Sequence, residues 1–165
     1  MTTPIISITG KSNSGKTTFL EKLITELTQR GYRIGAVKHT HEKFEFDKEG
    51  KDSWRHKKAG ARATLVVTDQ TVALVKDDQR PDIDKMRAFL SDNDLILAEG
   101  FKHHDLPKIE IFRNDSPHDD PVCLDNPDLI AFVTDSRHRP DVPVFGLEDV
   151  ADVADLIESR YLKEI

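Results

Sequence analysis

Residues 10–18, GKSNSGKTT, have the residue types and spacing of a phosphate-binding loop. Gly10, Gly15, Lys16 and Thr17 fit the pattern G-x-x-x-x-G-K-S/T, in which the backbone N–H groups of a glycine-rich turn bind phosphate oxygens. In this pattern the lysine reaches the β- and γ-phosphates, and the threonine hydroxyl ligates Mg²⁺. We therefore predict nucleotide contacts from the loop and the residues directly after it, namely Gly10, Lys11, Ser12, Asn13, Ser14, Gly15, Lys16, Thr17 and Thr18.

A bound Mg²⁺ needs an acidic side chain beside Thr17, and Glu99 is the best candidate. Glu99 ends a continuous apolar run, and ligands of open parallel sheets lie at the carboxyl ends of strands. We predict that Thr17 and Glu99 hold the metal and that Lys16 and Glu99 are catalytic. Asp47 and Asp52 are alternative metal ligands, and Glu99 could also be an ordinary surface carboxylate at a strand end.

Two residues at the predicted site leave alternatives open. Lys11 occupies the position of a lysine that, in dimeric nucleoside triphosphatases related to nitrogenase iron protein, reaches the phosphates bound by the partner subunit. Alternatively, Lys11 is an exposed lysine that raises the local positive potential. Asp135 follows the apolar run LIAFVT and could accept hydrogen bonds from N1–H and N2–H of guanine, although the Asn-Lys of the usual N-K-x-D pattern is missing. Alternatively, Asp135 caps a turn. The sequence gives a slight preference for guanine.

Alternating strands and helices must position these residues. A strand at 5–9, a helix at 16–30 and a strand at 33–38 make a βαβ unit, which implies parallel strand pairing. Further strands are expected at 94–100, 108–113, 129–134 and 142–145, and further helices at 52–59, 83–90 and 150–161. This alternation predicts an α/β fold of the P-loop NTPase type, with three layers and a mainly parallel sheet that has helices on both faces.

The segment 62–76 does not fit this alternation. Two β-rich runs, ATLVVT and TVALVK, flank the pair Asp69-Gln70, which predicts an antiparallel hairpin whose turn lacks the usual glycine. Within a single domain spanning 1–165, the hairpin is either an edge of the same sheet or a projecting arm. An exposed strand edge would favour pairing with a second copy, so we expect a homodimer.

Composition and charge narrow the class of protein. The formal net charge of −6 argues against general nucleic-acid binding. The segment 48–62 is locally basic, and it is either a solvated helix face or an anion-binding surface. No apolar run is long enough to cross a membrane, and the lone Cys123 cannot form an internal disulfide, so a reducing cytoplasm is the expected compartment.

Three segments together resemble the molybdopterin-guanine dinucleotide biosynthesis adapter (MobB) family: GKSNSGKTTFLEKLI, VKHTHEKFEFDKEGKDSWRHKKAGA and DLILAEGFKHHDLPKIEIFR. The resemblance covers 5–113 and continues more weakly through LIAFVTD and VPVFGLEDV. It implies a cytoplasmic, dimeric P-loop protein that binds GTP and Mg²⁺, hydrolyses GTP weakly, and assists the guanylyltransferase that joins GMP to molybdopterin. Molybdopterin itself and molybdoenzyme maturation proteins are further expected partners. Asp47, Asp52 and Arg55 match the middle segment, and a phosphate-bearing pterin would suit Arg55, Lys58 and Arg62.

Two other classes of function stay open. A small-molecule kinase would use the same phosphate loop but would show substrate-dependent turnover. An oligomerising interaction protein with a decayed loop is the third alternative, and the intact Lys16 and Thr17 argue against it. We favour the GTP-binding adapter, with slow hydrolysis because the sequence offers no obvious water-positioning Gln or arginine finger.

Overall fold

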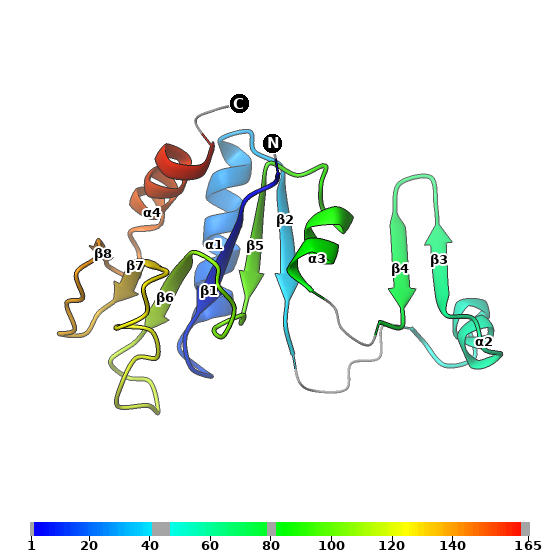
Figure 1. Ribbon diagram of the computed structural model, residues 1–165, viewed down its shortest axis with the longest axis horizontal. Coiled ribbons are helices and arrows are strands. Elements are labelled where there is room, and N and C mark those ends of the chain that lie inside the picture. The colour runs from blue at the N-terminus through cyan, green and yellow to red at the C-terminus, as the bar shows by residue number, and fades with distance from the viewer. Residues whose placement is uncertain (1, 41–46, 79–81, 163–165) are drawn as a thin grey trace. The chain divides into compact units, whose positions relative to one another are not determined.

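The computed structural model describes residues 2–40, 47–78 and 82–162, and the chain divides into two compact units. The first unit comprises Met1–His39 and Ile83–Ile165, and the second comprises Thr40–Asp82. Figure 1 shows the elements of both units.

The first unit is built on a six-stranded sheet with the order β2-β5-β1-β6-β7-β8. Its strands are β1 (Ile5–Thr9), β2 (Ile34–Lys38), β5 (Leu95–Glu99), β6 (Lys108–Phe112), β7 (Leu129–Thr134) and β8 (Val144–Phe145). All neighbouring strands pair in parallel. Every residue of β1 and β6 is buried, as expected for central strands that are covered on both faces.

Helices cover both faces of this sheet, which confirms the predicted three-layer α/β fold (Figure 1). One apolar cluster joins α1 (Lys16–Gln29) and α4 (Val150–Ile157) to Ile6 and Ile8 of β1. The other joins α3 (Ile83–Phe89) to Ile5. Because adjacent strand residues point to opposite faces, the apolar run of β1 supplies both clusters.

The last predicted helix ends earlier as an α-helix than the sequence indicates. After Ile157 the chain continues as a π-helical turn, Glu158–Leu162, which buries Leu162. No helix in the part of the chain that the structure describes is both long and apolar enough to span a bilayer.

The second unit contains α2 (Asp52–Lys58) and an antiparallel hairpin of β3 (Ala63–Val67) and β4 (Val72–Lys76). The hairpin forms a two-stranded sheet of its own, so the possibility that it is an edge of the main sheet is excluded. Its turn closes without glycine because the Thr68 hydroxyl accepts the backbone N–H groups of Gln70 and Thr71.

Candidate functional site

The predicted site residues of the first unit meet at one edge of the parallel sheet. The carboxyl ends of β1, β5, β6 and β7 lie at this edge, and Ile8 of β1 is in register with Glu99 of β5. The phosphate loop directly follows β1, whereas Asp135 directly follows β7. The loop is therefore flanked by Glu99 on the β5 side and by the ends of β6 and β7 on the other side. This is the edge at which ligands bind in open α/β sheets.

The phosphate loop depends on backbone conformations that favour glycine. Gly10 has φ 137° and Gly15 has φ 87°, and Asn13 adopts the left-handed region with φ 62°. A side chain at Gly10 would place its Cβ 2.4 Å from the Ile111 carbonyl oxygen, so the loop leaves β1 against the backbone of β6. Of the remaining predicted loop contacts, Ser14 is buried, and Ser12 and Thr18 are exposed.

The amino end of α1 is free to face an anion. Gly15 is the N-cap residue and gives no side-chain cap, and the first turn of the helix contains no acidic residue. The unpaired N–H groups and the positive end of the helix dipole are therefore available to phosphate oxygens. The Lys16 ammonium crosses the loop and donates a hydrogen bond of 2.6 Å to the Lys11 carbonyl oxygen.

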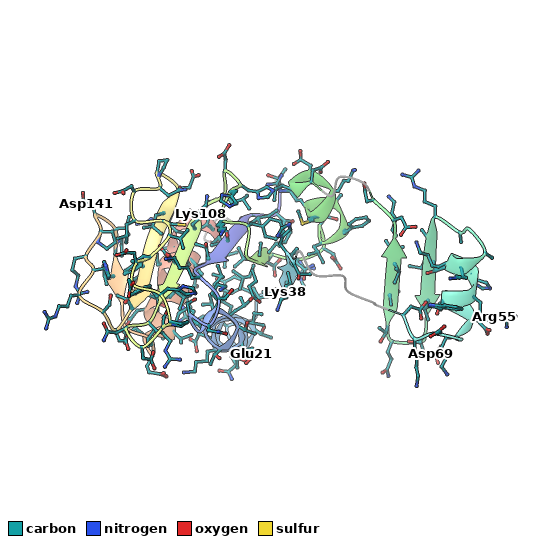
Figure 2. The ribbon with its side chains drawn as sticks, turned by 90° about the horizontal axis from the view of Figure 1, so that it is seen from below. Glu21, Lys38, Arg55, Asp69, Lys108 and Asp141 are labelled. Carbon is teal, nitrogen blue, oxygen red and sulfur yellow. The ribbon has the colours of Figure 1, made fainter. Side chains whose placement is uncertain are left out.

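Burial and neighbouring charges both act on Lys16. Burial lowers the pKa of its ammonium below the ordinary value; Glu99 raises this pKa, and Lys38 and Lys102 lower it further. Lys38 ends β2 and is labelled in Figure 2. Two neighbouring ammonium groups thus disfavour the charged form of Lys16, and a bound polyanion would favour it.

Thr17 and Glu99 have a separation that suits a shared magnesium ion. The Thr17 hydroxyl donates a hydrogen bond to Glu99 Oε1, and the two oxygens are 3.1 Å apart. Adjacent ligands of octahedral Mg²⁺, each at about 2.1 Å from the metal, are separated by about 3 Å. The distance between the Thr17 and Glu99 oxygens is therefore compatible with the predicted metal site.

Asp135 makes a contact that the sequence does not indicate. Its Oδ1 accepts a 2.6 Å hydrogen bond from the backbone N–H of Asn114, in the loop after β6, and the residue is exposed. This contact joins the loops after β6 and β7, which agrees with a structural role in the loops. Its role as a guanine ligand stays a prediction.

The other predicted contacts belong to the second unit, where they make local interactions. The Asp47 carboxylate accepts hydrogen bonds from the Lys48 N–H and the Ser53 hydroxyl, at 2.9 and 3.0 Å. On α2, an exposed ion pair of 3.7 Å joins Asp52 and Arg55, and Arg55 is labelled in Figure 2. The Lys58 ammonium lies 5.6 Å from the centroid of the Trp54 ring, and the Arg62 carbonyl accepts the Asp77 N–H. The predicted roles of these residues in metal, cofactor or partner binding stay predictions.

Sequence reasoning missed three cationic residues at the phosphate-loop edge. Lys38 ends β2, Arg113 follows β6 directly, and Lys102 lies three residues after Glu99. Arg113 lines the pocket that also contains Gly15, Lys16 and Glu99. Lys38 and Arg113 could have been found from the sequence, because each lies at the end of a predicted parallel strand, as Glu99 does.

Comparison with known proteins gives consistent matches. Residues 5–135 match the family model described as Molybdopterin guanine dinucleotide synthesis protein B. The chain is 38% identical over 159 residues to the molybdopterin-guanine dinucleotide biosynthesis adapter protein of Escherichia coli (strain K12), covering 93% of this chain and 91% of that protein. A protein of the same name from Haemophilus influenzae is 36% identical, over 94% of this chain and 88% of that protein. Among solved structures, the crystal structure of Bacillus subtilis MobB matches with a TM-score of 0.76 and 27% identity, over 98% of this chain and 99% of that chain.

Proposed function

This chain belongs to the molybdopterin guanine dinucleotide synthesis protein B family, and we propose that it is an adapter in the biosynthesis of molybdopterin guanine dinucleotide that binds GTP with Mg²⁺. The names of its relatives support the adapter role. The observation that carries the nucleotide part is the Lys16 ammonium within a glycine-rich loop at the uncapped start of α1. This arrangement provides N–H donors and one positive charge for a polyphosphate.

Nucleotide binding would change the hydrogen-bond partners of these side chains. Lys16 would exchange the Lys11 carbonyl for β- and γ-phosphate oxygens, which favours its charged form. Thr17 and Glu99 would exchange their mutual hydrogen bond for the metal. When bound, Mg²⁺ would neutralise charge on the phosphates. The site is thus preformed, and nucleotide replaces internal contacts that are already present.

We expect GTP hydrolysis to be slow. Among the described residues that line the phosphate-loop pocket there is no glutamine to orient an attacking water. Phosphate-loop proteins that lack an arginine finger hydrolyse GTP at rates of roughly 3–5 × 10⁻⁴ s⁻¹. A rate in this range would suit an adapter in which the bound triphosphate has a lifetime of roughly tens of minutes.

The preference for guanine rests on Asp135. One of its carboxylate oxygens holds the Asn114 N–H, and the residue is exposed at the edge that the nucleotide would occupy. The second oxygen can accept from guanine, whereas adenine presents no N1–H donor. We expect Asp135→Asn to reduce the ratio of GTP to ATP affinity.

The basic segment 48–62 offers a surface for an anionic partner. Arg55, Lys58 and Arg62 are exposed. We propose that they contact the phosphate of molybdopterin or an acidic surface of the guanylyltransferase, and molybdoenzyme maturation proteins are further candidates. Charge reversal at Arg55 and Lys58 should weaken this binding, and unchanged binding would leave the segment as a solvated helix face.

The apolar hairpin supports a homodimer. Leu65 pairs with Leu74 and Val67 with Val72, so these four side chains share one face, and each is between 45% and 65% exposed. An isolated two-stranded hairpin is marginally stable in water and has unpaired edges. We propose that the hairpin of a second copy covers this face. Whether Lys11 then reaches the phosphates of the partner depends on this dimer.

Calorimetric titration tests the nucleotide part of the proposal. GTP and GDP should bind in the presence of Mg²⁺, and ATP should bind more weakly than GTP. Removing Mg²⁺ should weaken GTP binding in the wild type, and this dependence should be much smaller in Glu99→Gln. Equal affinity for ATP and GTP would contradict the guanine assignment. Rapid turnover that requires a small-molecule acceptor would instead indicate a kinase.

A further inference from the structure

Arg113 lies against the phosphate loop, although it comes from a distant part of the sequence. It follows β6 directly, and β6 is the parallel neighbour of β1. Its Cδ would be 3.1 Å from a Cβ placed at Gly15, so the stem of the side chain packs over the glycine at which α1 begins. Together with Lys16, Thr17 and Glu99 it lines a pocket of about 460 Å³.

At least one N–H group of the Arg113 guanidinium makes no hydrogen bond within the part of the chain that the structure describes. Its Nη2 donates a 2.8 Å hydrogen bond to Asp115, whose carboxylate is exposed. Its Nε is buried and has no hydrogen-bond partner among the residues that the structure describes. A buried donor without a partner is unfavourable, and one explanation for such a donor is an anion that it binds. A planar guanidinium can present two parallel N–H groups to one phosphate.

The strand order indicates which part of a bound nucleotide would lie near Arg113. The metal pair Thr17 and Glu99 lies on the β5 side of β1, whereas Arg113 lies on the β6 side. Mg²⁺ bridges the β- and γ-phosphates in such sites. If Thr17 and Glu99 held the metal, the nucleoside end of a bound nucleotide would extend away from β5, towards the ends of β6 and β7. Asp135, the candidate guanine ligand, lies there and holds the residue next to Arg113 through the Asn114 N–H.

We propose that Arg113 is a nucleotide-binding residue whose guanidinium contacts the α-phosphate of a bound guanine nucleotide. This inference rests on the proposed GTP binding. It places Arg113 at the α-phosphate, which GTP and GDP have in common. This role differs from that of an arginine finger. An arginine finger acts on the γ-phosphate in the transition state and affects the rate of hydrolysis rather than affinity for GDP.

The test compares Arg113→Ala with the wild type in calorimetric titrations of GTP and GDP with Mg²⁺, followed by single-turnover hydrolysis at saturating enzyme. We expect both affinities to fall by a similar factor, on the order of 10-fold, as for loss of one charge-assisted phosphate contact. The hydrolysis rate of bound GTP should stay within about threefold of the wild type, because a group that binds ground and transition states equally does not change that rate.

Arg137→Ala is the matched control, because Arg137 is an exposed arginine after β7 that does not line the pocket. It should leave both affinities unchanged.

Arg113→Lys separates binding from folding. It keeps the stem over Gly15 and the positive charge but loses the two-pronged donor, so it should melt like the wild type and still bind both nucleotides several-fold more weakly. If Arg113→Ala does not fold, the same result with Arg113→Lys still supports the proposal, and wild-type affinity of Arg113→Lys overturns it. Unchanged affinities in a folded Arg113→Ala would also overturn it. A loss confined to the hydrolysis rate would instead identify an arginine finger.

The wild type separates this inference from the proposed function. If the wild type binds neither nucleotide, the proposed function fails and this inference fails with it. Normal wild-type binding with an unaffected variant contradicts only the inference.

Discussion

The two units of the chain differ in how they hold their candidate functional side chains. In the first unit, β1 and β6 are buried throughout, and the phosphate loop leaves the sheet between covered strands. In the second unit, α2 has no buried residue, and the hairpin exposes Leu65, Val67, Val72 and Leu74. Thr64 is the only buried residue between 47 and 78. The candidate phosphate site of the first unit thus lies on buried strands, whereas the second unit exposes apolar and basic side chains that a partner could cover.

The largest expected difference between the units concerns two glycines. Gly10→Ala would force a Cβ to 2.4 Å from the Ile111 carbonyl oxygen at φ 137°, whereas Gly60→Ala has φ 109° but meets nothing within 4 Å. We expect Gly10→Ala to reduce the free energy of unfolding by about 3 kcal/mol or more, and Gly60→Ala by about 1 kcal/mol. Chemical denaturation measures both. Equal losses would show that the phosphate loop is not held against β6 as described.

The apolar face of the hairpin gives the next largest effect. The double change Leu65→Lys and Leu74→Lys places two charges on a face that a second copy should cover. Analytical ultracentrifugation should show a dimer dissociation constant raised on the order of 100-fold, because burial of two leucines is lost. Asp69→Lys, at the exposed hairpin turn, is the control and should leave dimerisation intact.

If the wild type is a monomer at all concentrations, the homodimer is wrong. Titrating GTP into the hairpin double variant also decides between the two interpretations of Lys11. Weaker binding would indicate that the lysine acts from the partner, and unchanged binding would indicate a local role.

A buried and a partly exposed carboxylate provide a smaller contrast. Glu110 is fully buried and accepts the N–H groups of Val122 and Cys123, whereas the Asp47 carboxylate accepts local hydrogen bonds in the second unit. Glu110→Gln should reduce the free energy of unfolding by about 1–3 kcal/mol, because the amide can replace only one of two acceptors. Asp47→Asn should cost less than about 1 kcal/mol.

The pH dependence of the Glu110→Gln effect has a definite sign. Burial raises the pKa of the Glu110 carboxyl above its ordinary value, although the two N–H donors oppose this shift. The folded state therefore takes up this proton at a higher pH than the unfolded state does. Relative to Glu110→Gln, the wild type should gain stability as the pH falls through the folded pKa to the ordinary value of 4.5. Denaturation curves at several pH values between 7 and 4 check this, and a relative loss on acidification would contradict it.

Periodicity and spacing in the sequence predict most of the elements, because each strand and helix of the first unit has its own local apolar pattern. The strand order is not local, however, and neither are the contacts that follow from it. Arg113 beside Gly15, and Asp135 on the Asn114 N–H, both require that β6 lies between β1 and β7. The sequence does not predict that the hairpin forms a separate sheet, for the same reason: the apolar pattern of a strand does not specify which strand pairs with it.

The central claim is that the loop after β1 binds the phosphates of GTP through Lys16, and titration of GTP·Mg²⁺ into the wild type, Lys16→Ala and Lys22→Ala tests it most directly. Lys22→Ala removes an ammonium from the same helix, where it pairs with Glu148 at 2.6 Å, away from the loop. We expect Lys16→Ala to lose affinity by on the order of 100-fold or more, equivalent to about 2.7 kcal/mol, and Lys22→Ala to bind like the wild type. Equal affinities for all three proteins would contradict the account.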